Sequence, residues 1–183
     1  MDKGYGSTSV ADILREADAN PGSFYHAFPT KQDLLLAVLD RYRSEIGPML
    51  LEPTWKDLDD PIDRIFELLG RYRQALEITD CSYGCPIGSL ALELHEPDPA
   101  VRELLAANFD AWVAAIAQCL ETAADRLPPN LDRNALAHFV LSVMEGGVMQ
   151  SRTHRSLDAF DASVSTLRHY FDCLQIEGSK SCE

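Results

Sequence analysis

This sequence of 183 residues has no long apolar run and no apolar N-terminal stretch. A membrane-spanning helix needs about 18 consecutive apolar residues, and no such run occurs. A signal peptide needs an apolar segment close to the N-terminus, and none is present there. The sequence therefore predicts a cytoplasmic protein without a membrane partner.

Basic residues are also scarce, because 16 Lys and Arg stand against 29 Asp and Glu, which gives a net charge of −13. Such an acidic chain usually argues against a nucleic-acid partner. The charge is unevenly spread, however. Residues 1–47 carry five basic and seven acidic side chains, whereas residues 48–183 carry 11 and 22. A phosphate-binding surface is therefore expected only in the first quarter of the chain.

The motifs of common enzyme and metal sites are missing as well. The sequence contains no glycine-rich phosphate loop, no nucleophile elbow and no cluster with the ligand spacing of a zinc site. The five cysteines are an odd number in a chain without a secretion signal, which argues against a disulfide framework. We therefore expect no enzyme activity, no cofactor and no metal.

Alternating strand patterns of useful length are lacking, and helical periodicity predicts an all-α fold. Three helices are expected in the first quarter, over residues 9–17, over residues 21–27, and from Thr30 to a stop at Gly47-Pro48. Ser9 with Asp12 has the spacing of a capping box, and Asn20 is a good N-cap residue. Asp18 is expected to adopt the left-handed conformation that the tight turn between the first two helices needs.

The remaining chain is predicted to form a larger helical domain, 48–183, after an N-terminal domain of residues 1–47. Residues 48–60, with Pro48 and Pro53, are expected to be an irregular connector. Five further helices are expected to start near Pro61, Pro86, Pro99, Asp132 and Ser156, and the tail from Gly178 is expected to fray.

Two short helices joined by a tight turn and followed by a long helix are typical of a helix-turn-helix DNA-binding unit. The second short helix would be the recognition element in the major groove. The candidate DNA-binding residues are Thr8, Ser9, Gly22, Ser23, Tyr25, His26 and Lys31. A plain helical hairpin with a solvated polar face has the same spacing, so the pattern alone leaves both interpretations open.

The residues themselves are more specific than their spacing. The segments GYGSTSVADI at residues 4–13 and PGSFYHAFPTKQDLL at residues 21–35 resemble the signature of the TetR family of transcriptional regulators. The resemblance covers residues 4–47, and the remainder agrees in the number and order of its helices. It implies an all-helical homodimer that binds a palindromic DNA operator and releases it when a small-molecule effector binds.

The resemblance also implies roles for the matched residues. Thr8 or Ser9, Tyr25, His26 and Lys31 match positions that usually contact phosphate. Gly22 and Ser23 match positions of the recognition helix that face bases. Phe24 and Phe28 match positions that pack inside the small domain.

Two features depart from the family pattern. Asp18 occupies a turn position where members usually carry glycine. A further helix usually precedes the position of Gly4, so the DNA-binding domain is expected to be N-terminally truncated, with less apolar cover for Val10, Leu14, Phe24 and Leu35. The alternative function is therefore a dimeric small-molecule or thiol-based sensor that has lost DNA binding.

The family places a ligand pocket among the long helices, where apolar walls would suit a hydrophobic effector. The candidate pocket residues are Phe66, Tyr72, Phe109, Trp112, Phe139 and Met144, most of which are also expected to be core. The family dimerises through the last two helices, and Gly146 and Gly147 would permit close helix approach in that interface.

Cys81 and Cys85 are a possible redox pair. Cys85 directly precedes Pro86 at an expected helix N-terminus, where the helix dipole favours a thiolate. A pair of partly buried thiols with no role fits the same sequence, and this reading is the one we favour.

Overall fold

The computed structural model describes residues 3–94 and 96–180, and within these ranges the chain forms helices and turns without any strand. The all-α prediction is thereby confirmed. Backbone contacts divide the chain into two compact units, one of residues 1–45 with 86–109 and one of residues 46–85 with 110–183. We call them unit 1 and unit 2. The functional division of the chain near residue 47 stays a prediction.

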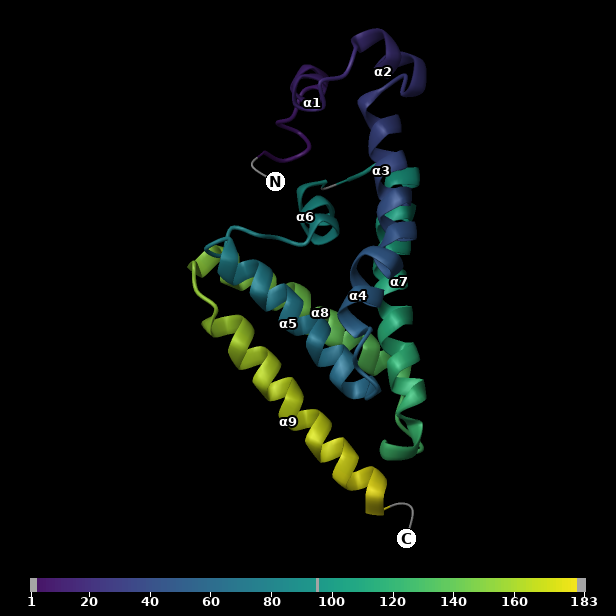
Figure 1. Cartoon of the computed structure of the whole chain (residues 1–183), viewed down its shortest axis with the longest axis vertical. Coiled ribbons are helices and arrows are strands. Elements are labelled where there is room, and N and C mark those ends of the chain that lie inside the picture. Colours follow the sequence, from purple (N-terminus) through teal and green to yellow (C-terminus); the bar gives the residue numbers. More distant parts are fainter. Residues whose placement is uncertain (1–2, 95, 181–183) are drawn as a thin grey trace. The chain divides into compact units, whose positions relative to one another are not determined.

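Unit 1 is built around three N-terminal helices and a returning segment (Figure 1). Its helices are α1 (Val10–Glu16), α2 (Pro21–Ala27), α3 (Lys31–Ile46) up to residue 45, α6 (Pro86–Glu93) and the first part of α7 (Pro99–Thr122). The predicted bounds of the first two helices are confirmed to within one residue. Inside unit 1, the buried amide of Asn108 on α7 donates to the backbone oxygen of Leu39 on α3 at 3.0 Å.

The predicted helix caps of unit 1 are present. Ser9 Oγ accepts the N–H of Asp12 at 3.1 Å, and the Asp12 carboxylate accepts the N–H of Ser9 at 3.1 Å. Asn20 Oδ1 accepts the N–H of Gly22 at 2.7 Å. Thr30 forms a reciprocal cap of the same kind with Asp33. These contacts satisfy backbone donors that the first turn of a helix leaves without a partner.

The turn between α1 and α2 has the predicted geometry. Asp18 has a φ of 48°, which is the left-handed region, so the chain reverses here without glycine. Aspartate tolerates this region better than most residues do, although less easily than glycine.

The predicted end of the third helix at Gly47-Pro48 is confirmed, but the irregular connector predicted after it is wrong. Helix α3 ends at Ile46, but the chain continues as the π-helical turn η1 (Gly47–Leu51) and the short helix α4 (Glu52–Trp55). The wider π turn accommodates Pro48, which lacks the N–H that an α-helix would require. Leu51 and Thr54 are buried, so much of the expected connector is folded structure.

Unit 2 contains the longer helices (Figure 1). They are α5 (Pro61–Ile78), the rest of α7, the 3-10 turn η2 (Ala124–Arg126), α8 (Arg133–His154) and α9 (Asp158–Lys180). Helix α9 packs along α8 and α5. Their apolar faces form a continuous core, in which Phe66 of α5 meets Phe171 of α9 edge to face at 5.3 Å between ring centroids.

Two glycine predictions need correction. The tail does not fray from Gly178, because α9 continues to Lys180 and Gly178 is buried against η2. A Cβ added at Gly178 would lie 2.5 Å from the backbone oxygen of Arg126. A Cβ at Gly147 would lie 2.7 Å from the Phe160 ring, so this glycine permits close packing of α8 on α9 within one chain rather than between two. A Cβ at Gly146 would meet nothing within 4 Å.

Among the described residues, no helix is both long enough and apolar enough to cross a membrane.

Candidate DNA-binding surface and buried polar cluster

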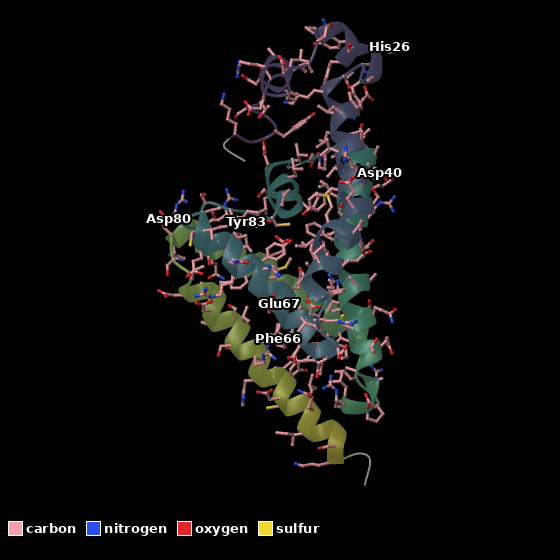
Figure 2. All side chains as sticks on the ribbon, viewed as in Figure 1. His26, Asp40, Phe66, Glu67, Asp80 and Tyr83 are labelled. Atoms are coloured by element: carbon pink, nitrogen blue, oxygen red, sulfur yellow. The ribbon has the colours of Figure 1, made fainter. Side chains whose placement is uncertain are left out.

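Helix α2 presents one buried side chain and several exposed polar ones. Phe24 is buried and stacks edge to face on Tyr25, with 5.2 Å between ring centroids. The four candidate DNA-binding residues of α2 are all exposed: Gly22, Ser23, Tyr25 and His26, the last labelled in Figure 2. Because Phe24 fixes the rotation of this short helix, its polar residues face outward together.

The hydroxyl groups of Thr8 and Ser9 are used in local structure. Thr8 Oγ1 donates to the backbone oxygen of Gly4 at 2.8 Å, which closes the loop before α1. Ser9 caps α1, and its hydroxyl also donates to the Asp12 carboxylate at 2.7 Å. Both residues therefore hold the start of α1 in a defined shape. Ser9 remains exposed, while Thr8 is half-buried.

The loop before α1 is fastened by two side chains from distant parts of unit 1. The Lys31 ammonium of α3 donates to the Tyr5 backbone oxygen and lies 4.0 Å from the centroid of the Tyr5 ring. The Glu93 carboxylate of α6 accepts the N–H of Tyr5 at 2.8 Å and that of Gly6 at 2.6 Å. Sequence reasoning missed Glu93, because this residue lies more than 80 positions from the loop that it holds.

Ion pairs occupy several of the few cations in this part of the chain. Arg15 pairs with Asp12 at 2.6 Å, and hydrogen bonds from Ser9 and Arg15 hold the Asp12 pKa well below its usual range. Arg41 and Arg43 pair with acidic residues of their own helix at 2.9 Å each. This leaves Lys3 and Lys31 as the cations of residues 1–47 for which no salt bridge is found within the described structure.

The expected loss of apolar cover in unit 1 is only partly seen. Phe24 and Leu35 are buried, with 8% and 7% of their surface exposed, so the prediction was wrong for both. Val10 and Leu14 are half-buried. An open hollow of about 260 Å³ remains on this unit, and Leu34, Leu35 and Val38 of α3 contribute to its apolar wall.

The six candidate pocket residues do not form one group. Tyr72, Trp112 and Met144 are buried in unit 2, and the rings of Tyr72 and Trp112 meet at 5.9 Å. Phe139 is 49% exposed on α8 and stacks on Tyr170 of α9. The two remaining candidates are not in this group either. Phe66 packs on Phe171 under the guanidinium of Arg168, and Phe109 belongs to unit 1.

Tyr72 instead belongs to a group that the sequence did not reveal. Its ring contacts that of Tyr83, which follows α5, with 6.1 Å between the ring centroids. Burial, with smaller contributions from the neighbouring Cys85 and Glu145, raises the pKa of Tyr83 to about 12. The Cys85 thiol hydrogen-bonds to the Glu145 carboxyl, and burial raises the pKa of Glu145. We call Tyr72, Tyr83, Cys85, Trp112 and Glu145 the buried polar cluster, in which Tyr83 and Glu145 are half-buried residues and Oε1 of Glu145 is a buried atom.

One signal could have pointed to this cluster. Glu145 is a carboxylate within the apolar stripe of α8, since Leu141, Met144 and Val148 around it are buried. Charged side chains are rarely placed on such a stripe without a partner or a function.

Cys81 and Cys85 form no disulfide in the described part of the chain, and both are buried, with 5% and 2% exposed. Buried structural thiols are usually unreactive. The hydrogen bond from Cys85 to Glu145 also uses the thiol proton, which a thiolate would not have. The geometry therefore favours two packed thiols, and a redox role stays a prediction.

The outer faces of α8 and α9 form an apolar groove in unit 2. Its volume is about 860 Å³, and Phe139, Val143 and Tyr170 lie along it. Phe139 and Tyr170 are 49% and 43% exposed, so their two contacting rings place apolar surface together on this groove.

The family models and the relatives that match this chain all describe transcriptional regulators. Residues 1–38 match the model described as bacterial regulatory proteins, tetR family, and residues 61–165 match the C-terminal domain of LmrA/YxaF-like transcriptional regulators. An uncharacterized HTH-type transcriptional regulator of Mycobacterium tuberculosis is 30% identical over 175 residues, which cover 92% of this chain and 86% of that protein. The transcriptional repressor DhaR of Mycobacterium sp. strain GP1 is 29% identical, with 91% and 83% covered.

Solved structures agree with these relatives. A TetR regulatory protein of Rhodobacter sphaeroides superposes with a TM-score of 0.80 at 26% identity, covering 90% of this chain and 88% of that one. The regulator CifR, solved with a 26-bp operator DNA, superposes with a TM-score of 0.74 at 21% identity, covering 91% and 88%. The matched models, the relatives and the helical architecture lead to one conclusion: this chain belongs to the TetR family of bacterial transcriptional regulators.

Proposed function

We propose that this protein is a repressor that binds a palindromic operator as a homodimer and releases it when a small ligand binds. The observation that carries the proposal is the exposed polar face of α2, which lies in the segment that matches the TetR DNA-binding model. DhaR is named a repressor and CifR is solved with operator DNA, and both support this assignment.

In this proposal, α2 enters the major groove. Gly22 and Ser23 are small and exposed, so the backbone can approach base edges closely. Tyr25, His26 and Lys31 would contact phosphate, together with Thr8 or Ser9 at the start of α1. The fastening of the loop before α1 by Lys31 and Glu93 supports such a surface, because ordered groups lose less entropy on binding.

The groove between the outer faces of α8 and α9 is proposed to be the homodimer interface. A palindromic operator requires two recognition helices related by a two-fold axis. The groove exposes apolar aromatic surface, which a second copy of the chain would cover.

Operator binding is tested by fluorescence anisotropy of the full chain against short duplexes from the DNA upstream of its own gene. Saturable binding that weakens steeply with salt is expected, because phosphate contacts release counterions. Absence of binding to every such duplex, together with a folded dimer, would instead favour a sensor without DNA binding.

Lys31→Ala is expected to weaken binding to all duplexes and to lower the slope of log affinity against log salt by roughly one. The physical reason is the loss of one phosphate contact, and because the Lys31 ammonium also donates to the Tyr5 backbone oxygen, thermal unfolding checks that the variant stays folded. Lys56→Ala is the matched control, because Lys56 is an exposed lysine of unit 2. Unchanged affinity and slope in Lys31→Ala would contradict the proposed docking.

Phe139→Glu is expected to weaken dimerisation at least about 100-fold, because it places a charge in the desolvated centre of the proposed interface. Since Phe139 is half exposed, the fold of the single chain should persist, which circular dichroism checks. Sedimentation velocity measures the association state. Met49→Glu, at a side chain that is 71% exposed elsewhere in unit 2, is the control. A Phe139→Glu protein that stays dimeric would place the interface elsewhere.

A further inference from the structure

Two buried polar atoms of the buried polar cluster have no hydrogen-bond partner within the described structure. They are Oε1 of Glu145 and Nε1 of Trp112, and the Trp112 side chain is fully buried. Buried polar atoms in native proteins nearly always have a partner, so each exception calls for an explanation. One of these atoms is an acceptor and the other is a donor, and both belong to the same cluster.

Aromatic rings connect these two atoms. The Tyr72 ring lies between Trp112, at 5.9 Å, and Tyr83, at 6.1 Å, and Tyr83 is close enough to Glu145 for the two groups to interact electrostatically. The negative faces of aromatic rings attract cations, most strongly where water is excluded. A carboxylate beside several rings is a combination that recognises an ammonium group.

The charge balance points to the same ligand. Burial raises the pKa of Glu145, and the Cys85 thiol supplies the one hydrogen bond found to lower it. No basic side chain in the described part of the chain has been found to lower it by its charge. A buried carboxylate is costly unless a cation or several donors compensate it. A protonated amine would supply both the charge and the missing donor.

We propose that the buried polar cluster binds the ammonium group of an arylalkylamine, with Glu145 accepting its proton donors and the rings of Tyr72 and Tyr83 facing its charge. This inference rests on the proposed ligand response and narrows the effector to amines that carry an apolar aromatic body. The Trp112 N–H is then available for an acceptor atom of the same ligand.

The test is isothermal titration calorimetry of the full chain with two matched probes, naphthylethylamine and naphthylethanol. The probes share their aromatic body and differ in an ammonium or a hydroxyl group. The amine is expected to bind the unmodified chain more tightly than the alcohol does. Glu145→Gln should weaken the amine by at least about tenfold and leave the alcohol unchanged, since the amide keeps the shape and loses the charge.

Glu121→Gln is the matched control, because it removes the same charge from a side chain that is 60% exposed. Tyr83→Leu is a second variant, which removes a ring while keeping an apolar side chain, and it should weaken the amine more than the alcohol. Thermal unfolding of each variant checks that the chain is folded. Glu145→Gln should be at least as stable as the unmodified chain, because it removes a buried charge.

Equal affinity of the two probes, with Glu145→Gln without effect, would overturn the amine assignment and leave a ligand-responsive repressor intact. Absence of heat with both probes would overturn the site itself. Neither result contradicts the proposed binding to operator DNA, because operator binding is measured without any effector.

Discussion

Gly147→Ala is expected to destabilise unit 2 by about 2 to 3 kcal/mol, the range of overpacking in a closed core. The added Cβ would lie 2.7 Å from a carbon of the Phe160 ring and 3.4 Å from the Phe160 Cα. Phe160 is 1% exposed, so its ring has no free space into which to move. The close packing of α8 on α9 would have to open.

Gly146→Ala is the matched control, because it changes the neighbouring residue of the same helix and meets nothing within 4 Å. Alanine is a better helix former than glycine, so this variant should gain up to about 1 kcal/mol. Urea unfolding followed by tryptophan fluorescence measures both variants, because Trp55 and Trp112 both lie in unit 2. Equal stability of the two variants would show that the contact of Gly147 with Phe160 does not limit packing.

Asp60→Ala is expected to cost about 2 kcal/mol, because it removes two interactions at once. Asp60 Oδ1 accepts the N–H of Ile62 at 2.7 Å at the start of α5, and Arg126 of η2 donates to both carboxylate oxygens at 2.7 and 2.8 Å. Asparagine also caps helices, so Asp60→Asn should retain the cap and lose the ion pair. With side chains about one-third exposed, that pair alone should contribute less than about 1 kcal/mol.

The same carboxyl group predicts a pH dependence. Hydrogen bonds from Arg126 hold the Asp60 pKa well below its usual range in the folded chain. The native state therefore binds this proton more weakly than the unfolded state does, and the contribution is fully present above about pH 4 and lost as the pH falls further. Urea unfolding at pH 7 and at pH 3 should show a smaller loss of stability for Asp60→Asn than for the unmodified chain. Equal losses would mean that Asp60 does not sense the pH.

The N-cap contacts of several helices could be predicted from the sequence. Ser9 with Asp12, Asn20 before Pro21, and Asp132 before α8 all cap the helices that they were expected to cap. Each of these contacts joins residues two or three positions apart. The backbone donors of a first turn are always present, so a suitable side chain at that distance is enough to predict the contact.

The structure after Gly47-Pro48 and at Gly178 was harder to predict from the sequence. Helix α3 ends before Gly47-Pro48, as local preference predicts, yet the residues after it form a π turn and a short helix instead of an irregular connector, and Leu51 and Thr54 there are buried. Gly178 suggests a frayed tail, yet it is the residue that lets α9 approach the backbone of Arg126. In both places packing outweighed local propensity.

The sequence by itself therefore determined the helical class, the family and the starts of most helices, because those depend on periodicity, motif and contacts within one turn. Only the tertiary structure decided that Glu93 holds the loop before α1, that Gly147 meets Phe160, and that Glu145 joins Cys85 and the rings of Tyr72 and Tyr83. These partners lie on different elements of the fold. The burial that raises the pKa of the Glu145 carboxyl group exists only after the helices have packed.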